Sequence, residues 1–224
     1  MGRPYDDNDP FDRKATVTET RDRVYSGQSP EQRDDSRRLR LRAASRELIG
    51  TLGYAATSVE KLCAEAKVST RHFYQLYDNK EGAFLDLYDH LTAQSFTAAS
   101  QALELTTGEP LADRIAAALV AYVGPMVEDL HVARITFVEA VGVSSKVEER
   151  RLSFREGVIG MIVGEGTAAV ARSEATDRDF RFAGLALVGA INAIVYDWAQ
   201  RSERESHVAL ESALTALAVT LLAG

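Results

Sequence analysis

The sequence predicts an all-α protein of about nine helices, with an N-terminal helix-turn-helix domain and a larger C-terminal helical domain. Apolar residues recur at three- and four-residue steps along residues 57–80, which is the pattern of two short helices joined by a tight turn. The helical pattern continues throughout the chain beyond Lys80. It is interrupted only at short breaks near residues 107–110, 142–145, 173–177 and 202–206.

The first 36 residues differ from the rest of the chain. They are polar and charged, contain Pro4, Pro10 and Pro30, and have almost no aliphatic side chains. Such a segment buries too little apolar area to offset the entropy lost on ordering. We therefore predict a disordered leader over residues 1–36, which is followed by the helix-turn-helix domain over 37–80 and the larger helical domain over 81–224.

The local chemistry of the helix pair can be followed along the chain. Thr57 and Glu60 have the spacing of a capping box, which predicts a helix start near Ser58. Ser69 is placed to cap the second helix. The predicted buried side of the pair consists of Val59, Leu62, Cys63 and Ala66 on the first helix and Phe73 and Tyr77 on the second.

The outward side of the second helix carries Thr70, Arg71, Tyr74 and Gln75. The N-terminal part of a recognition helix reaches base edges in the major groove. Arg71 suits a guanine edge and Thr70 a thymine methyl or a base acceptor. Phosphate contacts are predicted for Ser69, Tyr74, Gln75, Lys80 and Thr57, and for either Arg38 or Arg40. The pattern alone is also compatible with a helical hairpin whose polar face meets solvent.

The run from Arg38 to about Leu91 resembles the DNA-binding domain of TetR-type transcriptional regulators. The matching residues are Gly53-Tyr54, Thr57, Val59, Ala64, Val68-Ser69, Phe73-Tyr74, Tyr77 and Asn79-Lys80-Glu81. The resemblance implies DNA contacts at Thr57, Ser69, Thr70, Arg71, Tyr74, Gln75 and Lys80. The chain departs from the family at Lys67, where a turn glycine is usual, and at Arg71 and Leu76. A residue at position 67 must therefore accept a backbone conformation that often needs positive φ.

Charge is unevenly distributed along a chain whose net charge is −7. Residues 1–36 hold 6 Lys or Arg and 9 Asp or Glu, residues 37–92 hold 9 and 7, and residues 93–224 hold 11 and 17. Only the segment with the helix pair is positive, and its cations cluster between Arg37 and Arg42. A local basic surface matters more for DNA binding than the total charge.

The remainder of the chain predicts helices over about 79–105, 111–129, 131–141, 145–172, 177–201 and 206–222, and Gly124-Pro125 predicts a kink in the second of these. The last two helices are apolar and rich in small residues, including Gly184, Gly189, Ala193 and Ala216. In TetR-type regulators the corresponding helices form a four-helix dimer interface, so the resemblance implies a homodimer on a palindromic operator. The buried core of a monomer would have a similar composition.

The middle helices resemble those that enclose an effector cavity in the family. The predicted ligand-binding residues are Tyr122, Met126, Phe137, Phe154, Met161, Asn192 and Tyr196. A few polar groups in an apolar surround suit a small, mostly apolar effector. Ordinary core packing explains each of these residues equally simply.

Other classes of protein receive little support. No run of 18 apolar residues occurs and the acidic start does not look like a secretion signal, which indicates a cytoplasmic protein without a membrane span. The single cysteine and the four scattered histidines predict neither a disulfide nor a metal site, and no cofactor is expected. Residues 164–169 match a dinucleotide-binding glycine pattern but lack βαβ surroundings, so no catalytic residue is predicted.

The resemblance implies a DNA-binding domain over residues 37–80 and an effector-binding and dimerisation domain over residues 81–224. The preferred interpretation is a ligand-responsive regulator, a repressor released from its operator by a small molecule. The alternative is a helical interaction protein of the same architecture that does not bind an operator.

Overall fold

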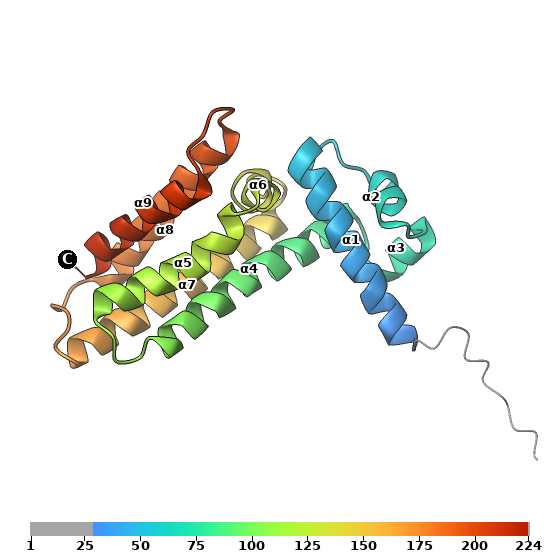
Figure 1. Cartoon of the computed structure of the whole chain (residues 1–224). Coiled ribbons are helices and arrows are strands. Elements are labelled where there is room, and N and C mark those ends of the chain that lie inside the picture. Colours follow the sequence, from blue (N-terminus) through green and yellow to red (C-terminus); the bar gives the residue numbers. More distant parts are fainter. Residues whose placement is uncertain (1–28, 224) are drawn as a thin grey trace, which may run out of the picture.

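The computed structural model describes residues 29–223, which contain nine α-helices and one π-helix and no strand. The helices are α1 Pro30–Leu52, α2 Val59–Ala66, α3 Thr70–Leu76, α4 Lys80–Leu105, α5 Leu111–Val127, α6 Leu130–Ala133, η1 Arg134–Glu139, α7 Ser145–Ala171, α8 Phe180–Gln200 and α9 His207–Leu222. Helices α1 to α3 form a small N-terminal body, and α4 runs out of it into an elongated bundle with α5 and α7 to α9 (Figure 1). The predicted all-α fold class is confirmed.

Helix α1 begins earlier than the sequence analysis predicted. Ser29 Oγ accepts a hydrogen bond from the Gln32 N–H at 3.1 Å, and Gln32 Oε1 accepts one from the Ser29 N–H at 2.8 Å. This is a capping box, with Pro30 in the first turn. The prediction of disorder is therefore wrong for residues 30–36, where the sequence Ser-Pro-Glu-Gln was the missed signal. Residues 1–28 lie outside the described residues.

The turn between α2 and α3 places Lys67 in the positive-φ conformation that the sequence predicted for this position. Lys67 lies in the left-handed region, with φ 52° and ψ 44°. The N-terminus of α2 is capped by Ser58, whose hydroxyl accepts from the Lys61 N–H at 3.3 Å. The predicted capping box at Thr57 and Glu60 is therefore wrong by one residue, although the predicted helix start is correct.

The N-terminal body has a compact core of its own. Phe73 of α3 is fully buried, and it packs with Leu41 and Ala44 of α1 and with Leu62 and Cys63 of α2. Burial raises the pKa of the Cys63 thiol, which favours the neutral form and a packing role. This core fixes α3 on α1 and α2 with its polar side outward.

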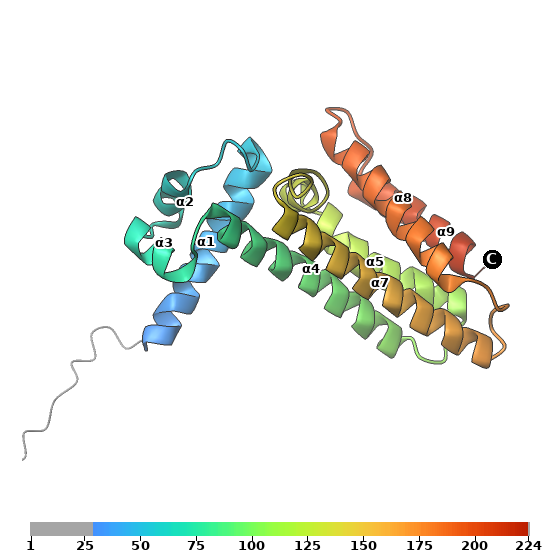
Figure 2. The same ribbon diagram turned by 180° about the vertical axis from the view of Figure 1, so that it is seen from behind.

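The bundle has a separate, larger core between α5, α8 and α9. After α5 the chain turns by 97° into α6 and η1. Pro125 lies in the last turn of α5, just before this bend. Most of the helix predicted over 131–141 is the π-helix η1, a wider turn that sequence periodicity does not reveal. Seen from behind, α6 and η1 lie between the two parts of the molecule (Figure 2).

The two parts are joined where α1 crosses α6 and η1. Gly50 of α1 lies directly against His131 of α6, so close that an added Cβ would stand 2.4 Å from His131 Cβ. Arg46 forms an ion pair with Asp129 beside this contact. Glu139 of η1 accepts a hydrogen bond from the Tyr54 N–H at 2.7 Å. The orientation of α1 therefore depends on α6 and η1.

Helix α8 is long and apolar enough to cross a membrane, and so is the bent pair of α5 with α6 and η1 when it is taken as one span. Length and composition are weak evidence, because the core helix of a water-soluble protein passes the same test. Leu187, Ile191 and Val195 of α8 are buried in the bundle core.

Replacing Gly50 with alanine tests the close approach of α1 to α6. The new methyl group would overlap His131, so we expect Gly50→Ala to lower the free energy of unfolding by about 1–3 kcal/mol. Gly160→Ala is the matched control, because Gly160 lies inside α7 with nothing within 4 Å of an added Cβ. That change should raise stability by about 0.5–1 kcal/mol. Urea unfolding measures both, and equal effects would contradict the proposed overlap.

Candidate DNA interface and effector cavity

The outer side of α3 carries the polar residues that the sequence placed there. Thr70, Arg71, Tyr74 and Gln75 are all exposed, and the Tyr74 side chain is 56% exposed despite its size. Ser69, at the N-cap, accepts from the His72 N–H at 3.3 Å and lies on the same exposed end. The structure therefore brings five of the predicted DNA-binding residues together.

Thr57 and Lys80 are placed differently. Thr57 is only 1% exposed, and its hydroxyl donates to the Gly53 carbonyl at 2.8 Å. Lys80 Nζ donates to the carbonyls of Tyr54 and Thr57, both at 2.8 Å, and lies 4.0 Å from the centre of the Tyr54 ring. Burial lowers the pKa of the Lys80 ammonium. These two side chains connect α1, α2 and α4 through hydrogen bonds to carbonyls. This placement does not favour the phosphate contacts predicted for them.

The cations of α1 also divide into two groups. Arg40 donates to the Lys67 carbonyl at 3.2 Å, which satisfies a carbonyl at the C-terminal end of α2. Arg38 lies 3.7 Å from Asp35, and its side chain is 43% exposed. An exposed pair of this kind is weak, so Arg38 remains a predicted phosphate contact.

A hydrogen-bonded cluster that sequence reasoning missed fixes α3 relative to α4. Arg42 of α1 donates to both carboxylate oxygens of Asp86 in α4, at 2.7 and 2.8 Å, and Tyr77 donates to the same carboxylate at 2.7 Å. Burial raises the pKa of Asp86, but the bonds from Arg42 and Tyr77 outweigh it and the net shift is downward. Arg42 and Tyr77 are 44 and 9 residues away from Asp86 in the chain, so no short sequence motif predicts this cluster.

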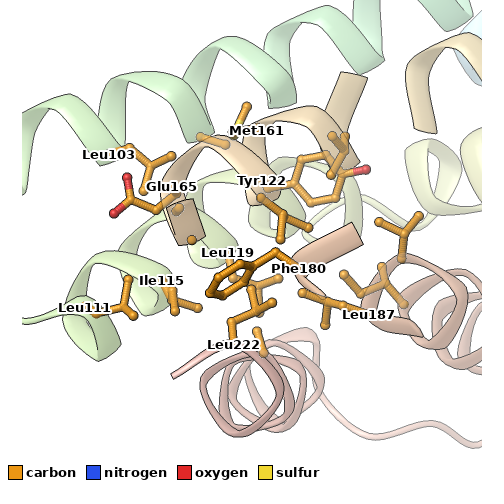
Figure 3. A pocket seen from close by; sticks show the side chains of 18 residues that line it. Leu103, Leu111, Ile115, Leu119, Tyr122, Met161, Glu165, Phe180, Leu187 and Leu222 are labelled. Atoms are coloured by element: carbon orange, nitrogen blue, oxygen red, sulfur yellow. The ribbon is translucent and has the colours of Figure 1, made fainter. Parts of the chain in front are cut away.

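The bundle encloses an apolar cavity of about 70 Å³ between α4, α5, α7, α8 and α9 (Figure 3). Leu119, Phe180 and Leu187 are typical of its wall. The one charged side chain that lines it is Glu165, whose carboxylate is held by Arg114 at 2.7 Å and Arg172 at 2.9 Å. The Glu165 carboxylate is thus already paired, and an occupant of this cavity meets aliphatic and aromatic surface.

A second cavity of about 230 Å³ adjoins the first. Tyr122 and Val188 line both, so they form the partition between them. The second cavity is more polar, because Glu148, Arg151 and Arg155 of α7 contribute to its wall. Tyr122 stacks on Phe154 with ring centres 6.2 Å apart. Burial raises the pKa of the Tyr122 phenol, which keeps it protonated.

Six of the seven predicted ligand-binding residues line one of these cavities. Tyr122 and Met161 line the first, and Tyr122, Met126, Phe137, Phe154 and Asn192 line the second. Tyr196 lines neither, because it is 41% exposed on the outer side of α8. The helical pattern identified a large amphipathic residue there but not the side of α8 on which it lies.

The outer side of α8 and α9 forms an exposed apolar surface, which we call the α8/α9 face. On α8 it includes Phe182, 71% exposed, together with Leu185, Ala186, Gly189 and Ala193. On α9 it includes Val208, Ala209, Ala213 and Ala216. Small residues dominate, so a second helix pair can approach the backbone closely. A contiguous apolar surface of this kind is typical of an interaction site.

Neither a metal site nor an enzyme motif stands out in the described part of the chain. Residues 29–223 contain no group of three or more His, Cys, Asp or Glu side chains arranged to hold a metal ion. Residues 164–169, the glycine pattern noted above, lie inside the continuous helix α7 rather than in a strand-turn-helix unit. The pattern therefore lacks the surroundings that dinucleotide binding requires.

Comparison with known proteins agrees with this architecture. Residues 41–87 match the family model for bacterial regulatory proteins of the tetR family. No curated protein sequence matches the chain significantly.

Among solved structures, FadR from Bacillus subtilis, in complex with stearoyl-CoA, superposes with a TM-score of 0.73 at 20% identity, covering 81% of this chain and 97% of that one. A putative TetR-family regulator from Syntrophomonas wolfei gives 0.72 at 16% identity, covering 85% and 97%. FadR from Bacillus halodurans gives 0.71 at 15% identity, covering 80% and 96%. The predicted resemblance to TetR-type transcriptional regulators is confirmed, and these structures share the fold.

Replacing Asp86 with asparagine tests the cluster that fixes α3. The pKa of Asp86 is lowered from 3.8 in the folded protein, so its contribution to stability is present above about pH 4 and disappears as the pH falls through the folded-state pKa. We expect Asp86→Asn to destabilise the protein at pH 7 and to have a smaller effect near pH 3. Thermal unfolding against pH measures this, and a pH-independent difference would contradict it.

Proposed function

We propose that this protein is a dimeric transcriptional regulator that binds a palindromic operator through α3 and is released by a small-molecule effector. It acts in the cytoplasm as a repressor. The observation that carries the proposal is the exposed set Thr70, Arg71, Tyr74 and Gln75 on a helix whose opposite side buries Phe73, within the segment that matches the tetR family.

The chemistry of this surface supports a DNA contact. Arg71 supplies a guanidinium suited to a guanine edge, and the hydroxyls and amide around it suit phosphate oxygens. Segment 37–92 is the positive part of an acidic chain, which restricts attraction for DNA to this end of the molecule.

The α8/α9 face supports the homodimer. It lies on the outside of the bundle and away from α3 (Figures 1 and 2). A two-fold pairing of these helices gives a four-helix interface and leaves both copies of α3 free. Two copies at a fixed separation read two half-sites, which explains why the operator should be a palindrome.

The two cavities support an effector with a large apolar part. FadR from Bacillus subtilis, which shares the fold, was solved with stearoyl-CoA. In the present chain the first cavity holds only about 70 Å³, little more than two water molecules, so a longer occupant must move its lining helices apart. Because α4 and α5 line it, the movement changes the position of α4 and hence of α3. Binding then favours a conformation with altered spacing between the two copies of α3.

The alternative is a helical interaction protein that has this architecture but binds no operator. It would retain the dimer and the cavities. Operator selection from random DNA, together with the region upstream of its own gene, separates the two functions.

Removing Arg71 should abolish specific DNA binding without unfolding the protein. We expect Arg71→Ala to weaken operator affinity by at least about tenfold, the typical value of one bidentate base contact. Tyr74→Phe should weaken all DNA sequences similarly and leave the salt dependence unchanged, because it removes a neutral phosphate donor and no charge. Arg150→Ala is the control, because it removes one positive charge from an exposed site on α7. Fluorescence anisotropy measures each affinity, and three equal effects would sink the assignment.

A charge on the α8/α9 face should prevent dimerisation. Ala193 is exposed on α8, so Ala193→Arg is compatible with the folded monomer but would bury an unpaired cation in the proposed interface. We expect a monomer in sedimentation equilibrium and weak binding to the palindrome. Gly160→Arg on α7 is the control and should remain dimeric. A dimeric Ala193→Arg protein would show that another surface forms the interface.

A further inference from the structure

Two tyrosines place their side chains at the second cavity. Tyr88 of α4 is 4% exposed, and it lines this cavity together with Tyr122. Within residues 29–223 neither phenol has a hydrogen-bond partner, and neither oxygen is fully enclosed by protein, so both hydroxyls can reach an occupant of the cavity. Burial raises the pKa of Tyr88 to about 12, although nearby Arg151 opposes the shift. Burial also raises the pKa of Tyr122, and Tyr88 adds to that effect. Both hydroxyls are therefore protonated at neutral pH and available as donors.

Two arginines of α7 line the same cavity. Arg151 pairs with Glu148 at 2.5 Å, one turn away. Arg155 lies 3.7 Å from Glu156, and its Nε is buried without a hydrogen-bond partner in the described chain. Two cations and one carboxylate therefore line the cavity, because Glu156 lies outside its wall. Buried polar groups in proteins are normally satisfied, so the unpaired Arg155 Nε, with two phenol donors beside it, points to an oxygen-rich partner.

The first cavity offers a different environment immediately beyond Tyr122. Its wall is aliphatic and aromatic except for Glu165, which Arg114 and Arg172 already pair. One ligand that fills both spaces must have an anionic, oxygen-bearing end and an apolar chain. A cation would meet Arg151 and Arg155, and a purely apolar molecule would leave the tyrosine hydroxyls unpaired.

We infer that the effector is an aliphatic acyl compound with an anionic head, held by Tyr88, Tyr122, Arg151 and Arg155, with its chain in the cavity lined by Leu119, Phe180 and Leu187. This inference rests on the proposed function, because it assigns the ligand class of the proposed effector site. The anionic head belongs either to a free fatty acid or to the carrier of an acyl thioester.

Equilibrium dialysis of the full-length protein with three probes tests the ligand class. We use palmitate, methyl palmitate and palmitoyl-CoA, each below its critical micelle concentration. Palmitate or palmitoyl-CoA should bind at least about tenfold more tightly than methyl palmitate, which has the same chain and no charge. Tighter binding of palmitate identifies the free acid, and tighter binding of palmitoyl-CoA identifies the thioester. Equal binding of all three, or no binding, would overturn the inference.

Variants locate the head and the chain. Tyr122→Phe and Arg155→Gln should each weaken the preferred probe by about tenfold and leave methyl palmitate unchanged, because they remove a donor and keep most of the side chain. Arg150→Gln is the matched control on the same helix, since Arg150 pairs with Asp89 and does not line the cavity. Ala118→Leu, which adds methylene groups to the first cavity, should weaken all probes and long chains most.

Operator affinity is measured on the same samples, which keeps the two proposals distinguishable. A protein that binds operator DNA but none of the probes refutes the ligand class and leaves the DNA-binding function standing. A protein that binds palmitate or palmitoyl-CoA through these residues but never binds an operator supports the ligand class and refutes the regulator. Unchanged probe affinity in Tyr122→Phe and Arg155→Gln would refute the assigned head site.

Discussion

The position of α3 depends on how the N-terminal half of α4 is attached to the other helices. Lys80 satisfies two carbonyls between α1 and α2, and six residues later Asp86 joins Arg42 to Tyr77. Both groups are partly buried, so losing one partner would leave a polar group unsatisfied. Helix α3 has only seven residues, too few to be stable without its neighbours. Its position therefore depends on that of α4.

A second connection links the cavities to the same body. Thr136 and Phe137 of η1 line the second cavity, while Glu139 of the same π-helix accepts the hydrogen bond from Tyr54 at the end of α1. Tyr88 of α4 lines that cavity two residues beyond Asp86. A ligand that displaces either η1 or α4 thus acts within a few residues of the contacts that position α3. The π-helix, a geometry often associated with functional sites, lies at this junction.

Periodicity predicted most helices to within a few residues, because each buries one stripe of side chains. It also placed Thr70, Arg71, Tyr74 and Gln75 outside, since Phe73 has to be inside. The surroundings of individual side chains are harder to predict. Resemblance and residue type indicate a role for Lys80 and Tyr196 but not their environment, which for Lys80 depends on Tyr54, 26 residues away. The start of α1 is different. Ser29 and Gln32 have the spacing of a capping box, but they lie among polar residues whose composition is typical of a disordered segment.

The energetics of a switch follow from the two cavities taken together. An effector shifts an equilibrium only by the difference between its affinities for the two conformations. The apolar cavity of about 70 Å³ is small for a long chain, so the proposed effector would favour an opened bundle. The unpaired donors of Tyr88, Tyr122 and Arg155 supply favourable bonds that partly offset the cost of opening. A tenfold preference for the opened form is worth about 1.4 kcal/mol, and a change from nearly all closed to nearly all open needs about 5.5 kcal/mol. In the proposed dimer, such bonds in each copy would add to this difference.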